Sequence, residues 1–215
     1  AYDAYMALIP DGPAKDGGKA VGAAAAAGML AMRTDDHFDD VVPYVQPTPG
    51  PGVFEPIAPT TPVDTKLPFV RPFTYGSPSD YRPGGPLELS SQRYARDVAE
   101  VQEVGRVNST TRTAEQTETV RFYTDQTFVQ YSRALRGLVN AQGLDLSESA
   151  RLLGYVHVAV ADTMIACWEA KYYYSFWRPN HAIQRADTDG NPATLPDVTW
   201  LPLVTGNHPE YPSGH

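Results

Sequence analysis

Two positively charged side chains late in the chain have the types and spacing of an anion site. Lys171 and Arg178 lie seven residues apart in the stretch KYYYSFWRP, and a proline follows the arginine directly. Arginine offers a planar fork that matches the oxygens of a phosphate-like anion, and lysine offers a compact point charge. The chain as a whole carries a net charge of −8, so a site that gathers two cations works against the overall field. The pair therefore indicates a site built for an oxyanion.

A second group of chemically useful residues lies in the final stretch, PSGH. Ser213 and Gly214 offer donors where the backbone must come close to an anion. They are expected to begin a helix, whose N-terminus favours negative charge. His215 can transfer a proton near neutral pH. We expect these residues to converge with Lys171 and Arg178 on one cavity about the size of a tetrahedral anion.

This combination of motifs resembles that of the vanadium-dependent haloperoxidases and the related type-2 phosphatidic acid phosphatases. K-x6-RP followed by PSGH is similar to the first two of three signatures of that superfamily. Trp168, three residues before the lysine, and Phe176-Trp177, before the RP pair, extend the resemblance. The third signature, S-R-x5-H, supplies the histidine that bonds vanadium, and it is not present in this sequence. We therefore expect the chain to be truncated after His215 and inactive by itself, with that histidine downstream and no metal ligand among the residues present.

The resemblance implies a role for each candidate residue. The residues that would hold vanadate are Lys171, Arg178, Ser213 and Gly214. The catalytic residues would be His215, as acid and base, together with Lys171 and Arg178. Trp168 and His208 would border the pocket through which halide approaches, although a surface-loop histidine is an equal alternative for His208.

Three functions are open at this stage. The first is a vanadium-dependent haloperoxidase, whose partners are hydrogen peroxide and a halide or small organic substrate. The second is a soluble acid phosphatase that hydrolyses phosphate monoesters, since vanadate mimics the phosphoryl transition state and one pocket serves both chemistries. The third is a non-catalytic fragment or helical module. The FWRP surroundings and Trp168 favour the haloperoxidase, and a homo-oligomer is left open.

The composition also bears on nucleic-acid binding, membrane spans, disulfides and zinc sites. The acidic net charge gives no support for nucleic-acid binding. No apolar run approaches the roughly 18–20 residues of a membrane span, so we expect no span and a soluble protein. The single Cys167 excludes an internal disulfide, and no Cys/His spacing resembles a zinc site. The compartment is not fixed by the sequence, with a secreted or periplasmic location slightly favoured.

Helical spacing dominates the chain, and the expected fold is a mainly α helical bundle of the vanadium haloperoxidase type, formed by one domain over 1–215. Within it we expect helices over 1–42, an ordered, extended, proline-rich connection over 43–89, and a helical part over 90–215 that carries the site motifs. The helices are expected at 1–9, 19–33, 90–105, 113–123, 128–142 and 147–174.

The last long helix presents a stripe of apolar residues that leads to the lysine. Met164, Trp168 and Lys171 follow one another at spacings of three and four, so they share a face. Asp162 lies on roughly the opposite face and is expected to hold a neighbouring helix or loop. His157 is expected to be a hydrogen-bonded core residue.

Overall fold

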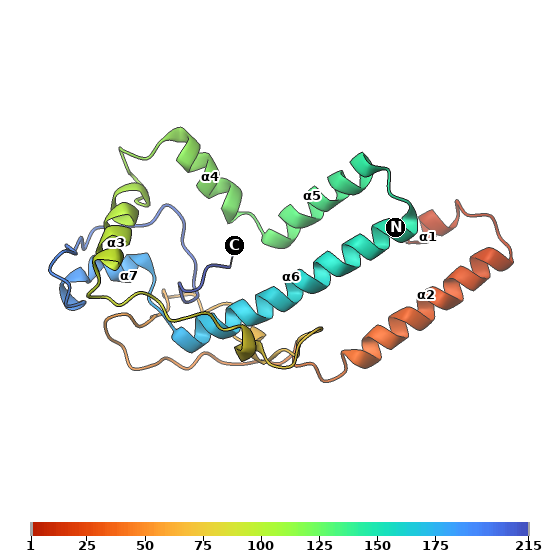
Figure 1. Cartoon of the computed structure of the whole chain (residues 1–215), viewed down its shortest axis with the longest axis horizontal. Helices are drawn as coiled ribbons and strands as arrows, with labels where there is room; N and C mark the ends of the chain where they lie inside the picture. Colours follow the sequence, from red (N-terminus) through yellow and green to blue (C-terminus); the bar gives the residue numbers. More distant parts are fainter. Residues whose placement is uncertain (1, 215) are drawn as a thin grey trace. The chain divides into compact units, whose positions relative to one another are not determined.

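The computed structural model describes residues 2–214. They form two compact units, which meet in the sequence between Phe38 and Asp39. Regular structure in the described residues consists of seven α-helices and three short 3-10 helices, with two isolated bridges and no sheet (Figure 1). The prediction of a mainly α fold is confirmed, whereas the single helical domain over 1–215 stays a prediction.

The N-terminal unit holds α1 (Tyr2–Met6) and α2 (Pro13–Met32), joined by a turn. Proline at the first position of α2 costs no hydrogen bond, because the N–H it lacks has no partner inside a helix. Lys15, in the first turn of α2, donates from its Nζ to Asp11 Oδ1 at 2.7 Å.

The start of α2 differs from the prediction. Its predicted start at Lys19 is six residues late, because Gly17 and Gly18 lie inside the helix rather than in a turn. No residue of α2 is buried. Alanine offers little apolar area, and the larger side chains of the helix, such as Leu30, are exposed.

The longest helix of the second unit is α6 (Leu146–Tyr174). Asp145 caps its start by accepting a hydrogen bond from the Glu148 N–H, while the Glu148 side chain accepts one from the Asp145 N–H. This reciprocal pair satisfies two donors that the first helical turn leaves open. The helix ends at Ser175, which adopts a left-handed conformation with φ of 44°. The predicted end near Tyr174 is confirmed.

Three shorter helices precede α6, and they lie close to their predicted bounds: α3 (Gln92–Val104), α4 (Ala114–Thr124) and α5 (Thr127–Gln142). Ser91 caps α3 by accepting from the Tyr94 N–H. Thr113 and Gln116 form a capping box at the start of α4. Gly143, at a left-handed φ of 61°, ends α5, as expected for a residue without a Cβ. Local capping chemistry therefore fixes these helices.

The proline-rich connection is ordered and extended, as predicted (Figure 1, orange to yellow). Two short 3-10 turns within it, η1 (Leu67–Phe69) and η2 (Pro78–Tyr81), contact α6. Phe54 and Val70 are buried, which gives the segment the apolar anchors that a disordered linker lacks.

Asp162 ties this connection to α6. Its buried carboxylate accepts hydrogen bonds from the backbone N–H of Phe73 at 2.6 Å and of Thr74 at 2.9 Å, and also from the Thr74 hydroxyl. Its carbonyl oxygen accepts from the Tyr75 hydroxyl at 2.7 Å. The structural role predicted for Asp162 is confirmed.

The main core of the second unit lies where α3 packs against α7 (Pro179–Gln184). Its buried members are Tyr94, Val98, Trp177, Ala182, Ile183 and Trp200. Trp177 is 2% exposed and is followed directly by Arg178. The arginine is therefore held between a buried tryptophan and the first residue of α7.

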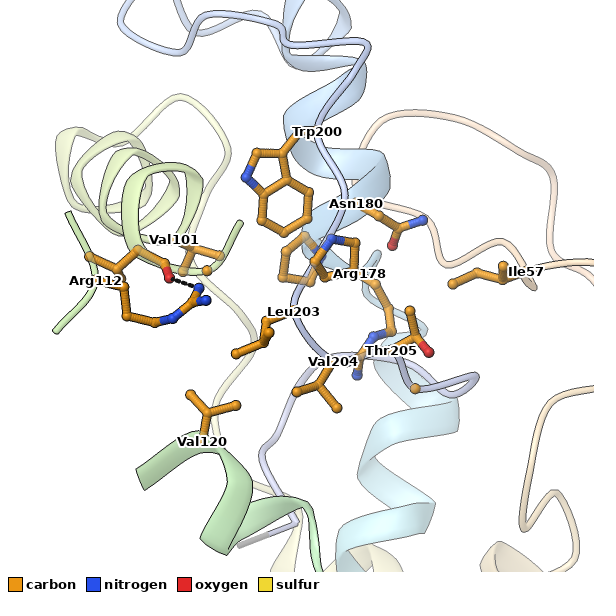
Figure 2. A pocket seen from close by; sticks show the side chains of 15 residues that line it. Ile57, Val101, Arg112, Val120, Arg178, Asn180, Trp200, Leu203, Val204 and Thr205 are labelled. Carbon is orange, nitrogen blue, oxygen red and sulfur yellow. Dashed lines mark hydrogen bonds between the residues drawn. The ribbon is translucent and has the colours of Figure 1, made fainter. Parts of the chain in front are cut away.

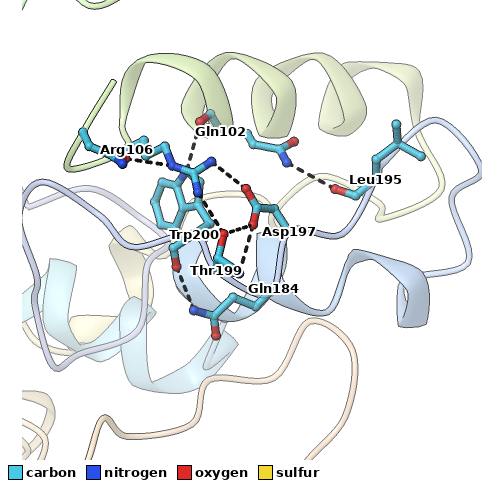
Figure 3. A network of polar contacts seen from close by, with 8 residues as sticks. Gln102, Arg106, Gln184, Leu195, Asp197, Thr199 and Trp200 are labelled. Atoms are coloured by element: carbon cyan, nitrogen blue, oxygen red, sulfur yellow. Dashed lines mark hydrogen bonds and ion pairs between the residues drawn. The ribbon is translucent and has the colours of Figure 1, made fainter. Parts of the chain in front are cut away.

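A polar network fixes the loop that follows α7 to α3 (Figure 3). Arg106 Nη1 pairs with Asp197 Oδ2 at 2.6 Å. The Trp200 indole N–H donates to the carbonyl of Gln102 at 2.9 Å, and Gln184 Nε2 donates to the carbonyl of Trp200 at 2.8 Å. Since residues 203–208 continue from this loop, the network sets where the chain returns toward Arg178.

Two expectations concern α6, and the one about His157 is wrong. By length and composition it is the one helix in the described part of the chain that could cross a membrane, with a mean hydropathy of 1.3 over its most apolar window. Core helices of soluble proteins pass the same test. His157 is exposed rather than buried in a core, because the described elements cover the C-terminal half of α6 and leave the half that holds His157 open.

Candidate functional site

The chain between α6 and α7 is short and extended, and it positions Arg178. Phe176 forms a β-bridge with Val53, and the Trp177 N–H donates to the carbonyl of Gly52 at 2.9 Å. Arg178 then has φ of −88° and ψ of 158° and stands at the N-cap of α7. The helix α6 ends at Tyr174, and Pro179 begins α7. Proline favours both this extended residue before it and the helix after it.

Lys171 is almost fully buried, with 1% of its surface exposed. Its ammonium group donates to the carbonyl oxygens of Pro209 and Glu210, both at 3.0 Å. An ammonium group has three donors, so these two acceptors leave one N–H for a further partner. Burial is the main cause that lowers the pKa of Lys171 to about 8, although Cys167 and Glu210 act in the opposite direction. A buried cation whose acceptors are neutral carbonyls is a suitable partner for an anion.

Arg178 reaches the same region and has a carboxylate partner. Its Nη1 lies 3.0 Å from Glu210 Oε2 and 3.5 Å from His208 Nδ1. Glu210 Oε2 is buried and makes no hydrogen bond within residues 2–214, so the contact with Arg178 is an ion pair of poor hydrogen-bond geometry. The Glu210 carboxylate is thus a negative group of the protein itself that already lies next to Arg178.

Trp168 packs against the other candidate residues. Its ring lies 5.6 Å from the ring of His208 and 5.6 Å from Lys171 Nζ. A Cβ placed on Gly214 would lie 3.3 Å from the Trp168 ring, so glycine is the residue that allows this approach. The indole N–H of Trp168 is buried and has no hydrogen-bond partner in the described part of the chain.

The structure describes only some of the site residues predicted at the C-terminal end. Ser213 is exposed and does not begin a helix within residues 2–214. Its carbonyl oxygen accepts a weak hydrogen bond from the Cys167 thiol at 3.6 Å. His215 lies outside the described residues, so its expected role as acid and base is untested.

The candidate residues lie around one open cavity of about 730 Å³. Its walls include the candidate residues Lys171, Arg178, His208, Ser213 and Gly214, together with Glu210. The cavity is far larger than the tetrahedral anion that the sequence led us to expect. Residues of α4 and of the start of α5 supply part of its wall. In the described residues no cluster of histidine, cysteine and carboxylate side chains could hold a metal ion.

Two residues of this region escaped sequence reasoning. Glu210 lies in HPEYPSGH, two residues after His208, and its nearness to the PSGH motif was the available signal. Gly206 is the other, because a Cβ there would lie 3.1 Å from His208 Nε2 and 3.3 Å from Arg178 Nη2. Glycine at this position lets the loop pass directly against the arginine.

Glu210→Gln is expected to strengthen oxyanion binding. The Glu210 carboxylate pairs with Arg178 and opposes any second anion, but its side chain is 41% exposed, which screens the effect. We expect an affinity gain of roughly 3- to 10-fold for tungstate, measured by titration calorimetry. Glu55→Gln is the matched control, because Glu55 pairs with Arg185 instead and lines no part of the cavity. Weaker binding by Glu210→Gln would show that Glu210 supports the anion rather than competing with it.

The lowered pKa of Lys171 predicts two opposite responses to pH. The unfolded chain keeps this lysine protonated up to its usual pKa of 10.5, whereas the folded protein loses the proton near 8. Between these values the unfolded state binds more protons, so this group makes folding more favourable as pH rises. Tungstate binding needs the ammonium form and should weaken over the same range. Lys171→Met should remove both responses, as followed by thermal unfolding and calorimetry from pH 7 to pH 10; an unchanged pH profile in this variant would refute the assignment.

Comparison with known proteins defines the class of this fold. Residues 151–215, which include both motifs, match the family described as the VCPO second helical-bundle domain. No curated protein matches the sequence. The segment that carries Lys171 and Arg178 therefore supports the predicted resemblance to the vanadium haloperoxidase superfamily.

One solved structure that the chain resembles is described as the first bacterial vanadium-dependent iodoperoxidase. It aligns with 93% of this chain at a TM-score of 0.74 and 21% identity. The chain spans about half of that structure, 50% of its length. At this identity the likeness shows the fold, and the predicted helical bundle of the vanadium haloperoxidase type is confirmed.

Proposed function

We propose that this chain supplies the cationic part of a vanadate-holding haloperoxidase site. The observation that carries the proposal is the convergence of Lys171 and Arg178 on one cavity with Ser213 and Gly214. The iodoperoxidase fold supports the same reading, although substrates and activity of the whole protein are part of the proposal.

The residues present fit a tetrahedral oxyanion. Lys171 keeps one N–H beyond its two carbonyl acceptors, and Arg178 provides a guanidinium at the same cavity. Ser213 and Gly214 line the cavity and offer donors where the backbone comes close to a ligand. Vanadate and phosphate share the charge and shape that such donors recognise.

In this proposal each site residue of the chain has its own role. Vanadate, when bound, supplies the Lewis-acidic centre at which hydrogen peroxide oxidises halide. Lys171 and Arg178 hold its oxygens and balance their charge. The burial of Lys171 keeps water from its ammonium group and strengthens the attraction. Trp168 and His208 form a ring-lined border beside these cations, where a polarisable halide could approach.

Activity in the full-length protein tests the proposal. After addition of vanadate, hydrogen peroxide and bromide or iodide, we expect halogenation of a dione probe that depends on all three additions. Lys171→Met should reduce this activity at least 100-fold, since hydrogen bonds to charged groups contribute about 1.5–3 kcal/mol each and the site acts as a unit. Halogenation that persists at full rate in Lys171→Met would refute the proposed site.

The alternative of a soluble acid phosphatase gives a different result in the same preparation. Hydrolysis of a phosphate monoester without vanadium, inhibited by added vanadate, would replace the haloperoxidase assignment while keeping the oxyanion site. A full-length protein that binds neither vanadate nor phosphate would favour the non-catalytic module.

A further inference from the structure

The loop that returns along the large cavity, the one of about 730 Å³, is held at two neighbouring points. Lys171 holds residues 209 and 210 through their carbonyl oxygens. Asn207 holds the residues just before them. Asn207 itself does not line the large cavity, but its neighbours Gly206 and His208 do. Any effect of Asn207 on the cavity must therefore pass through these neighbours.

Asn207 bonds to the proline-rich connection through both polar atoms of its side chain. Its Oδ1 accepts from the Ile57 N–H at 3.0 Å, and its Nδ2 donates to the carbonyl oxygen of Thr60 at 2.8 Å and to the Thr60 hydroxyl at 2.9 Å. Its own carbonyl oxygen accepts from the Val63 N–H at 3.0 Å. The side-chain bonds join residues 147 to 150 positions apart in the chain, so no local sequence pattern predicts them.

The turn formed by residues 206–208 lies directly against Arg178. A Cβ on Gly206 would lie 3.3 Å from Arg178 Nη2, and His208 Nδ1 lies 3.5 Å from Arg178 Nη1. Figure 2 shows Ile57, from the connection, lining a smaller cavity together with Arg178 and Thr205. Because the turn touches the guanidinium at both of its terminal nitrogens, the position of the guanidinium depends on where the turn is held.

We infer that Asn207 is a positioning residue of the oxyanion site, which holds the turn 206–208 against Arg178 and so keeps the guanidinium at the large cavity. The inference rests on the proposed function, because it takes the large cavity as an oxyanion site. A binding group must stay within about 0.5 Å of its productive position, which requires neighbours that are themselves fixed. The proline-rich connection provides this support, although none of Ile57, Thr60 and Val63 lines the large cavity.

Tungstate titration of the full-length protein tests the inference. Asn207→Ala should weaken tungstate binding about tenfold, the loss expected when one charge-assisted hydrogen bond from Arg178 is misplaced. A folded Asn207→Ala variant that binds tungstate as tightly as the wild type would overturn the inference.

Asn191→Ala is the matched control. Asn191 also bonds to the backbone through both polar atoms of its side chain, but it does not line the large cavity. The two variants should lose similar amounts of thermal stability, whereas Asn191→Ala should change tungstate affinity less than about twofold. Equal losses of affinity in both would mean that lower stability alone weakens binding, and the inference would be wrong.

The pH profile of binding separates a displaced arginine from a loosened loop. Lys171, whose pKa is lowered to about 8 by burial, bonds to the same loop at Pro209 and Glu210. If Asn207→Ala moves only the turn beside Arg178, tungstate affinity should fall by the same factor at every pH, with its midpoint still near pH 8. A general loosening would expose Lys171 and return its pKa toward 10.5, which would keep binding strong to higher pH. A midpoint shifted upward contradicts the inference.

A milder variant covers the case in which Asn207→Ala does not fold. Thr60→Val removes one acceptor of the Asn207 amide, and Thr60 is an exposed residue outside the large cavity. The expected loss of tungstate affinity is about two- to fourfold, as for one neutral hydrogen bond. Thr188→Val is its control, because the Thr188 hydroxyl bonds to the carbonyl oxygen of Arg185 instead, and it should bind as the wild type does. Unchanged affinity in Thr60→Val would then overturn the inference.

Wild-type binding separates the failure of this inference from the failure of the proposed function. If the wild type does not bind tungstate, the proposed oxyanion site is wrong and the inference fails with it. If the wild type binds tungstate and Arg178→Gln loses it, while Asn207→Ala binds as the wild type does, the site stands and only the role of Asn207 is wrong.

Discussion

Replacing Arg178 by Gln is expected to weaken tungstate binding roughly 100-fold, because up to two charge-assisted hydrogen bonds are lost at about 1.5–3 kcal/mol each. The change also leaves the Glu210 carboxylate without its ion-pair partner, so that its charge then repels the ligand. Helical content should stay the same, since Arg178 stands on extended backbone and its side chain does not cap α7. Titration calorimetry and circular dichroism check the two halves of this prediction.

Arg96→Gln serves as the control for the loss of one positive charge from the whole protein. Arg96 is exposed on α3 and does not line the large cavity, so its replacement should change tungstate affinity less than about twofold. An equal loss in both variants would mean that the net charge, rather than the placement of Arg178, controls binding.

Asp162→Ala is expected to lower the free energy of unfolding by about 3–5 kcal/mol, because its buried carboxylate accepts three hydrogen bonds and each bond to a charged group contributes about 1.5–3 kcal/mol in a non-additive way. The loss should release residues 73–75 from α6 and leave the N–H groups of Phe73 and Thr74 without their acceptor. Urea unfolding of the full-length protein measures the effect.

Asp97→Ala provides the comparison for Asp162→Ala. Asp97 is an exposed carboxylate on α3, so its replacement should change stability by no more than about 0.5 kcal/mol. A loss below about 1 kcal/mol for Asp162→Ala would show that the proline-rich connection is held to α6 by its apolar contacts instead.

The helices could be predicted because the signals that define them are local. Ser91, Thr113 and Gly143 each cap or end a helix through contacts within four residues, and the sequence shows these contacts directly. The spacing of Lys171 and Arg178 was equally informative, since α6 and the short extended link after it set their separation. Asp162 could be given a structural role from its place on the helix, but its partners could not be named.

The features that sequence reasoning missed depend on contacts between distant parts of the chain. Glu210 meets Arg178 because the loop after α7 returns across the cavity, and its path is fixed by Arg106 and Trp200 in contacts that span more than 90 residues. His157 was expected in a core because its helical face is apolar further along. Whether that face is covered depends on α4 and α5, whose placement no local pattern gives.

The crystal structure of the full-length protein with bound tungstate tests the central claim most directly. The account predicts tungstate in the large cavity, with Lys171 Nζ and an Arg178 guanidinium nitrogen each about 2.7–3.2 Å from its oxygens. The Glu210 carboxylate should have moved away from Arg178 to admit the ligand. Tungstate bound elsewhere, with the Arg178–Glu210 pair intact and Lys171 still bonded only to carbonyl oxygens, would contradict the account.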